Sequence, residues 1–173
     1  MKTIYLPLSI LALLLISFTG SAQSRSYKIY DQFAHRDGFT SMAFSKSMID
    51  AVNFNIDEEN KKVTGDLMEI RILFANHDKT KNEESLGARI SDKFSKMDYR
   101  KVEPNKQKGN DNVEFWIEGN SKTVKECHVI VSNEEDKQFS CLVSFYGNFK
   151  VEDLKSFEKF SRGQAKKEDS NEK

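Results

Sequence analysis

The sequence has no excess of charge of either sign. Its 27 lysine and arginine residues equal its 27 aspartate and glutamate residues, so the formal net charge at pH 7 is zero. Proteins that bind nucleic acids or membrane surfaces electrostatically carry a basic excess on one element. The lysine-rich segment 101–108 contains Glu103 and is better explained as a solvated hairpin tip. The balance argues against a nucleic acid or a membrane surface as partner.

The sequence also lacks the motifs of familiar catalytic and metal sites. No GxSxG, P-loop, HExxH or EF-hand pattern occurs. The three histidines are His35, His77 and His128, and no two of them stand at the spacing of metal ligands. Asp31 stands four residues before His35, and Asp78 directly follows His77. Both pairs are best explained as solvated polar residues. We therefore expect no cofactor, no metal and no identifiable catalytic residue.

Cysteine is scarce. Only Cys127 and Cys141 are present, and they form no CxxC motif. Segments 123–131 and 138–146 each carry apolar residues on one face, and pairing them through a three-residue loop places Cys127 opposite Cys141. Directly opposed residues have Cβ atoms about 4.5–5.5 Å apart, slightly wider than a disulfide prefers. Two expectations stay open: a disulfide in an oxidising compartment, or two buried free thiols.

Residues 1–22 have the layout of a signal peptide. Lys2 is followed by an apolar run over residues 4–18 and then by small residues that end at Ala22. The run is shorter than the roughly 20 residues that span a bilayer as a helix, so we expect cleavage before Gln23 rather than a transmembrane anchor. No cysteine near this junction can accept a lipid. The expected product is exported, periplasmic or secreted, and unanchored.

Removing 22 of the 173 residues leaves 151, enough for one domain and too few for two. We expect the domain over residues 23–160. Residues 161–173 are rich in charge and poor in apolar side chains, so they cannot offset the entropy of ordering. We expect them to form a disordered polar tail.

Apolar periodicity predicts the elements of this domain. The expected strands share alternating or dense apolar residues: 39–44, 67–74, 99–102, 113–117, 123–131 and 138–146. The expected helices have apolar residues at helical spacing: 27–35, one after Ser45 that buries Met48, Ile49 and Val52, one with Leu86, Ile90, Phe94 and Met97, and a last one with Leu154 and Phe157 that stops near Gly163.

Short connections between the later strands favour antiparallel pairing. The predicted fold class is α+β, a single domain with a mainly antiparallel sheet packed with about three helices. The sheet is expected to combine a four-strand C-terminal meander with one or two N-terminal strands.

One strand carries a candidate contact site. Trp116 stands between Glu114 and Glu118 on the strand face opposite Val113, Phe115 and Ile117. If that face is open, the indole and the two carboxylates can contact a partner or a sugar. If helices cover that face, Trp116 is an ordinary core residue.

The segment 38–49, GFTSMAFSKSMI, resembles the opening signature of the family called domain of unknown function 4252. Later pieces agree in order, among them the strand 113–117 and the segment 145–149 around Gly147. The resemblance covers about residues 28–160. It implies an exported protein of a Gram-negative bacterium, in the periplasm or cell envelope. Many relatives look like lipoproteins, whereas this chain lacks the lipidated cysteine. The family has no assigned activity, so no site residue carries over.

Three functions are compatible with these observations. The first is a non-catalytic binding or accessory module of the cell envelope whose partner is a protein or a glycan. The second is a periplasmic carrier of a small apolar ligand or lipid, suggested by the 13 phenylalanines. The third is a hydrolase without a recognised motif, which the fold alone does not support.

Overall fold

The computed structural model describes residues 23–51, 66–80, 86–103, 113–120, 122–132 and 138–171. Their centre is a six-stranded sheet with the order β1-β2-β6-β5-β4-β3. Every neighbouring pair is antiparallel. The strands are β1 (Phe39–Ser45), β2 (Asp66–Ala75), β3 (Arg100–Val102), β4 (Val113–Gly119), β5 (Thr123–Ser132) and β6 (Phe139–Lys150). The predicted meander is β3 to β6, and the two N-terminal strands extend it beyond β6.

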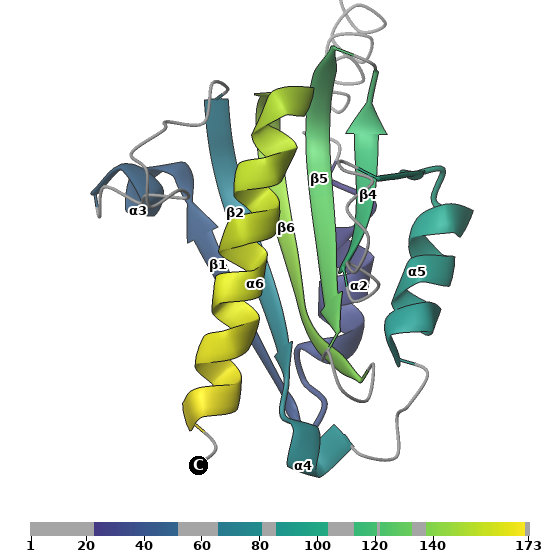
Figure 1. Cartoon of the computed structure of the whole chain (residues 1–173), viewed down its shortest axis with the longest axis vertical. Helices are drawn as coiled ribbons and strands as arrows, with labels where there is room; N and C mark the ends of the chain where they lie inside the picture. The colour runs from purple at the N-terminus through teal and green to yellow at the C-terminus, as the bar shows by residue number, and fades with distance from the viewer. Residues whose placement is uncertain are drawn as a thin grey trace, which may run out of the picture.

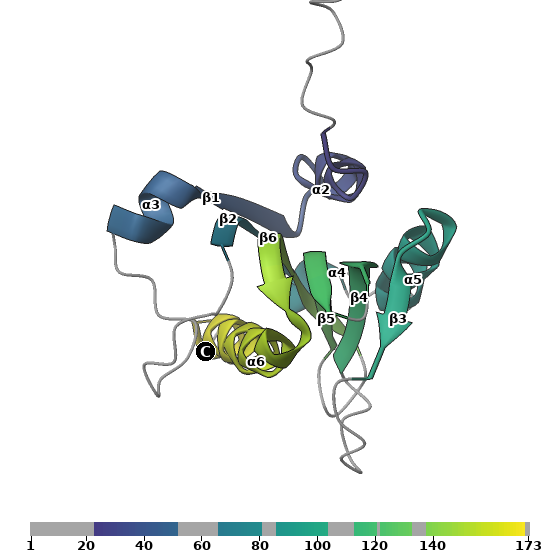
Figure 2. The same cartoon turned by 90° about the horizontal axis from the view of Figure 1, so that it is seen from above.

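Helices cover both faces of this sheet (Figures 1 and 2). The α-helices are α2 (Tyr27–Phe33), α3 (Lys46–Ala51), α4 (His77–Thr80), α5 (Leu86–Lys96) and α6 (Leu154–Asn171), and the 3-10 helix η1 (Val151–Asp153) precedes α6. Helix α6 lies on one face, which we call the α6 face. Helices α2 and α5 lie on the other, which we call the α2/α5 face. The structure is α+β, as predicted.

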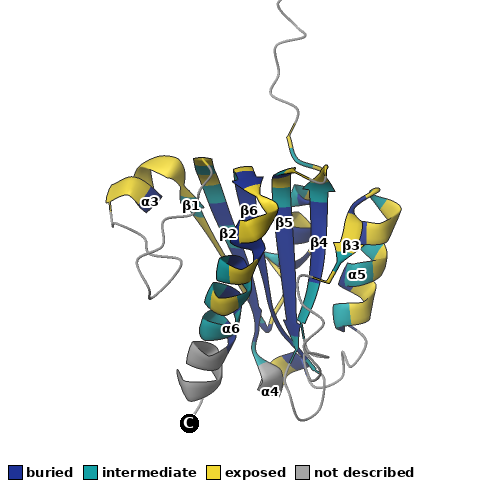
Figure 3. Ribbon diagram, turned by 45° about the horizontal axis from the view of Figure 1, so that its top comes forward, coloured by how far each residue is buried: buried dark blue, intermediate teal, exposed yellow. Residues whose placement is uncertain are grey.

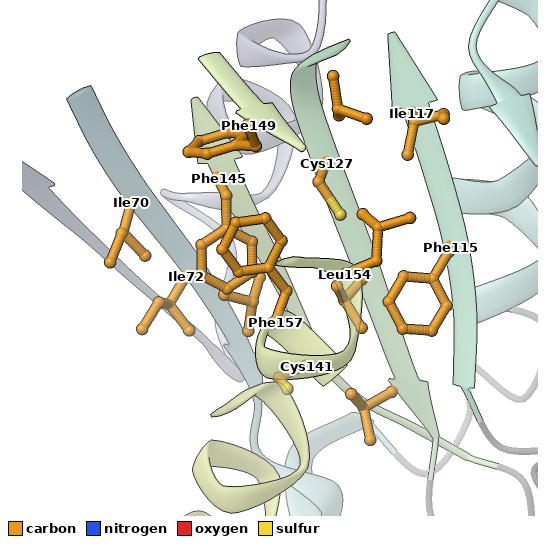
Figure 4. Packing of buried hydrophobic residues seen from close by; sticks show 14 of the residues in the cluster. Ile70, Ile72, Phe115, Ile117, Cys127, Cys141, Phe145, Phe149, Leu154 and Phe157 are labelled. Atoms are coloured by element: carbon orange, nitrogen blue, oxygen red, sulfur yellow. The ribbon is translucent and has the colours of Figure 1, made fainter. Parts of the chain in front are cut away.

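Period-two alternation divides the apolar side chains between two cores. On the α6 face, Ile70, Ile72, Cys127 and Phe145 belong to one buried cluster with Phe157 of α6. Figure 4 shows this packing, in which the rings of Phe145 and Phe157 stack with centroids 4.1 Å apart. On the α2/α5 face, a second cluster joins strand residues to the buried sides of the two helices, Ile29, Tyr30, Phe33, Leu86, Ile90 and Phe94.

The last helix is longer than predicted. Helix α6 continues through Gly163 to Asn171, and Ala165 is buried against the α6-face core. A glycine inside a helix costs only about 1 kcal/mol relative to alanine, which the packing of this helix outweighs. The expected stop near Gly163 is wrong. Residues 161–171 of the tail expected over 161–173 are helical, and residues 172–173 lie outside the described residues.

One detail of the N-terminal half also differs. In α3, Ile49 is buried as expected, but Met48 is 49% exposed; Val52 lies outside the described residues. The expected helix around Leu86 is confirmed, and Met97 packs at the margin of the same core.

Candidate functional site

Polar side chains gather under α2 on the α2/α5 face. Glu126 and His128 stand two residues apart on β5, and Ser144 and Tyr146 stand two apart on β6. The register pairs His128 with Ser144 and Glu126 with Tyr146, so all four lie on one face in one patch. Residues from other elements complete the group, which we call the polar cluster: Glu126, His128, Ser144, Tyr146, Tyr30, Tyr99, Ser24 and Ser26.

Glu126 is the hydrogen-bond acceptor at the centre of the polar cluster. Its Oε2 accepts hydrogen bonds from the Tyr99 hydroxyl and from Ser24 Oγ, each at 2.7 Å, and a longer one from Ser26 Oγ at 3.4 Å. Burial acts to raise the pKa of Glu126, but its interactions with His128, Ser24 and Tyr99 outweigh the burial, and the pKa is lowered. A half-buried carboxylate is thus kept ionised.

His128 is buried, with an exposed fraction of 0%. Its Nδ1 lies 2.7 Å from Ser144 Oγ. Its Nε2 lies 3.3 Å from Glu126 Oε2, without the geometry of a hydrogen bond. The ring stacks on Phe94 at 4.5 Å between centroids and meets Tyr99 edge to face at 4.8 Å. Burial lowers the pKa of His128, and Glu126 opposes this in part, so the imidazole is neutral at pH 7.

Two tyrosines connect α2 and the N-terminal segment to β6. The Tyr30 hydroxyl of α2 donates to the backbone oxygen of Arg71 at 3.1 Å and lies 2.6 Å from Ser144 Oγ. The Tyr146 hydroxyl lies 2.7 Å from Ser26 Oγ. Burial raises the pKa of both tyrosines, so both hydroxyls stay protonated.

A charged group extends the cluster toward β2. The guanidinium of Arg71 lies over the ring of Tyr27 at 3.5 Å and forms an ion pair with Glu69. The Tyr27 hydroxyl donates to the same carboxylate. Burial, followed by these interactions with Glu69, raises the pKa of Tyr27 to about 12. Tyr27 and Tyr30 therefore attach both ends of the first turn of α2 to the sheet.

The polar cluster contains a serine, a histidine and a carboxylate, the residue types of a catalytic triad. Their burial and hydrogen bonds indicate a structural role instead. Ser144 and His128 are fully buried, and the Ser144 hydroxyl already lies between Tyr30 and His128. A nucleophile needs an oxygen that a substrate can reach. Among the described residues, no group of three His, Cys, Asp or Glu side chains is placed to hold a metal ion. The arrangement fastens α2 and residues 24–26 onto the sheet.

The predicted contact residues lie at the side of this cluster. Trp116 is only 7% exposed and stacks on Phe94 of α5 with centroids 6.1 Å apart. Glu114 accepts hydrogen bonds from Ser91 and from Trp116 Nε1 and pairs with Lys101, while Glu118 pairs with Arg25. Of the two alternatives, the structure agrees with the core residue, because α5 covers this strand face.

The two cysteines lie on one face, but not opposite each other. Cys127 pairs with Phe145, and Cys141 pairs with Val131 and with Phe74 of β2. The predicted register correctly places odd residues of β5 opposite odd residues of β6, but it is shifted by four residues. The shift arises because the pairing is irregular between Val131 and Ser132 and because the connection between the strands is longer than three residues. Four residues along a strand separate the thiols by about 13 Å. Both are buried and neither is in a disulfide, which agrees with the second alternative.

Sequence reasoning missed the polar cluster. One signal in the sequence could have found it. Glu126 and His128 share one face of a strand whose other face carries Cys127 and Val129, and two successive polar residues on one face of a buried strand are uncommon. The partners of these residues come from positions 24–30 and 144–146, more than 15 residues away in sequence. Local spacing cannot reveal them.

Comparison with known proteins gives one family match. The family described as Domain of unknown function (DUF4252) matches residues 30–157. The chain belongs to the DUF4252 family. The DUF4252 match runs from α2 to the first turn of α6 and includes every strand of the sheet. No curated protein and no solved structure matches the chain. In the described part of the chain, no helix combines the length and the apolar character that crossing a bilayer requires.

Proposed function

We propose that this DUF4252 protein is exported to the cell envelope and acts there by binding another macromolecule. The observation that carries this proposal is the outer side of β1. Residues 40–43 of this strand are exposed, and β1 has a strand neighbour only on its β2 side among the described residues. Figure 3 shows the exposed surface running from β1 into α3.

Three exposed methionines mark the same region. Met42 on β1 is 40% exposed, Met48 on α3 is 49% exposed and Met68, at the irregular start of β2, is 48% exposed. Methionine side chains are flexible and polarizable, so they adapt to the shape of a partner. We call the outer edge of β1 together with Met42, Met48 and Met68 the β1 surface.

The interior of the protein supports binding over catalysis. Glu126 accepts a hydrogen bond from Ser24, and Ser144 lies between Tyr30 of α2 and His128, so the acid–base residues of the polar cluster are bonded within the fold. The carrier hypothesis receives no support from the aromatic residues that suggested it. Phe145, Phe149 and Phe157 pack on one another in the α6-face core, with ring centroids 4.1 and 5.0 Å apart.

Export and binding can be tested in the native cells. Fractionation followed by N-terminal sequencing should find the protein outside the cytoplasm with Gln23 first. A photo-crosslinking amino acid in place of Met42 should give a covalent adduct, while the same substitution of Lys101, on the opposite edge strand β3, should not. Protein in the cytosol with Met1 still attached would contradict the export proposal. Equal adducts, or none, at the two positions would contradict binding through the β1 surface.

A further inference from the structure

The two edges of the sheet differ in how they resist pairing with another strand. Edge strands expose backbone N–H and C=O groups, and proteins usually protect them with charge, proline, bulges or short length. Strand β3 has three residues and begins with Arg100 and Lys101. Strand β1 has seven residues, none charged and none proline, and its register with β2 has no irregularity. Only β3 carries the usual protection.

We propose that β1 pairs antiparallel with β1 of a second copy of this chain, about a two-fold axis at Met42. The pairing joins two six-stranded sheets into one continuous sheet. In this inference a second copy of the chain is the macromolecule that binds the β1 surface, so the inference rests on the proposed binding function. A two-fold dimer uses the same patch on both copies, so this patch must be complementary to itself.

The composition of β1 meets that requirement. The register centred on Met42 is the one that pairs all seven residues. It sets Met42 opposite Met42, Thr40 opposite Phe44 and Ser41 opposite Ala43. Thr40, Met42 and Phe44 lie opposite Phe74, Ile72 and Ile70 in β2 and so belong to the α6 face. The pairing therefore continues the apolar α6 face from one copy to the other, and on the α2/α5 face it sets Ser41 opposite Ala43 and Phe39 opposite Ser45.

The charges that flank β1 also favour the antiparallel arrangement. Asp37 precedes the strand and Lys46 follows it; their side chains are 87% and 46% exposed, and each also forms a surface ion pair within its own chain, with Lys79 and Asp66. Antiparallel pairing brings Asp37 of one copy beside Lys46 of the other at both ends of the shared ladder. Parallel pairing would bring the two Lys46 residues together. Antiparallel pairing thus places opposite charges next to each other, whereas parallel pairing would place like charges next to each other.

A charge-swap pair tests the partner and the register together. The variant S41K/A43K sets lysine opposite lysine twice across the axis, and S41E/A43K sets glutamate opposite lysine twice. Both positions are exposed, so the fold should tolerate both variants. By sedimentation of the exported protein, the wild type should reach twice the monomer mass. The lysine pair should weaken dimerisation at least about tenfold, and the glutamate–lysine variant should restore it. Circular dichroism checks folding.

Crosslinking supplies a second test. Met42→Cys should form a covalent dimer under mild oxidation, because the two residues meet at the axis. Thr40→Cys is the matched control, since its two copies lie about 13 Å apart along the ladder in this register. The native thiols Cys127 and Cys141 are buried and should not interfere. Equal crosslinking of the two variants would overturn the register.

A wild-type protein that stays monomeric at high concentration would overturn self-pairing. If the photo-crosslinker at Met42 then captures a different protein in cells, the proposed function stands and only the second copy is wrong as its partner. If it captures nothing, both proposals fail.

Discussion

His128 couples the stability of the polar cluster to pH. Its pKa in the folded protein is below the ordinary 6.5, because burial disfavours the charged imidazole. The unfolded chain then binds a proton more readily than the folded one as pH falls through 6.5. Stability is therefore full above about pH 6.5 and is lost below it. Glu126, whose pKa is also lowered, adds a further loss below its ordinary 4.5.

We predict that the free energy of unfolding falls by about 1 kcal/mol between pH 7.5 and pH 5.5. His128→Gln removes the titrating group, so its stability should be lower at pH 7.5 but nearly the same at pH 5.5 as at pH 7.5. Urea denaturation at the two pH values measures both. His35→Gln is the control, because His35 is exposed, and it should keep the wild-type dependence. If His128→Gln keeps it too, the pH dependence arises elsewhere.

At the scale of single helices and strands, two glycines differ in whether their position requires the absence of a side chain. A Cβ on Gly147 of β6 would stand 2.0 Å from the backbone oxygen of Asp66, and the φ of Gly147 is +157°. This close approach lets β6 bend beside the irregular start of β2. Gly163 inside α6 has no atom within 4 Å of an added Cβ. Here the absence of a side chain gives the helix no advantage and costs backbone entropy.

The substitutions Gly147→Ala and Gly163→Ala should therefore change stability in opposite directions. We expect Gly147→Ala to lower the free energy of unfolding by about 1–3 kcal/mol or more, through the steric overlap. Gly163→Ala should raise it by about 0.5–1 kcal/mol, because alanine favours the helical backbone. Equilibrium urea denaturation at one pH compares the two. No gain for Gly163→Ala would contradict a continuous α6.

The local apolar pattern of this chain predicts which helices and strands form, but not where each of them ends. The alternation of residues 113–131 and the helical spacing of Leu86, Ile90 and Phe94 predict β4, β5 and α5 correctly, because each pattern matches one buried face. The extension of α6 depends on Ala165 packing against the distant α6-face core, which overrides the glycine before it. Register failed for a similar reason, since an irregularity at the end of β5 shifts the pairing of Cys127 and Cys141.

The candidate site was less predictable than the fold. Period two places Glu126 and His128 on one face, but nothing local shows that α2 will cover that face or that Ser24 will reach Glu126. In the same way, the exposure of Trp116 depended on whether α5 packs over it. Contacts between elements that are far apart in sequence decide these questions, and pattern within one element does not contain them.

At the scale of the whole molecule, the beginning of the described chain belongs to the polar cluster. Residues 24–26 stand at the beginning of the described chain, yet they provide hydrogen bonds to Glu126 and Tyr146 on the central strands. If cleavage leaves Gln23 as the first residue, the exported chain keeps only four residues before α2. Those few residues are then part of the fold and would not act as a free N-terminal arm.

A protein that begins at Tyr27 should accordingly be less stable than one that begins at Gln23. It loses two donors to the half-buried carboxylate of Glu126 and the partner of the Tyr146 hydroxyl, a cost of about 2–3 kcal/mol in the free energy of unfolding. Without Ser24 the pKa of Glu126 should also rise toward its ordinary value, so the loss of stability that Glu126 adds below pH 4.5 should be smaller in the truncated protein. Urea denaturation at pH 7.5 and pH 4 measures both effects.

Arg25→Ala is the matched control for that truncation. Arg25 lies between the two serines, but its ion pairs with Asp98 and Glu118 are at the surface, where such pairs contribute little. It should change the free energy of unfolding by less than about 1 kcal/mol. Ser26→Ala should reproduce part of the truncation, because it leaves the buried Tyr146 hydroxyl without the serine oxygen. If the truncated protein matches the longer one at both pH values, residues 23–26 do not stabilise the sheet, and the polar cluster is maintained by α2 alone.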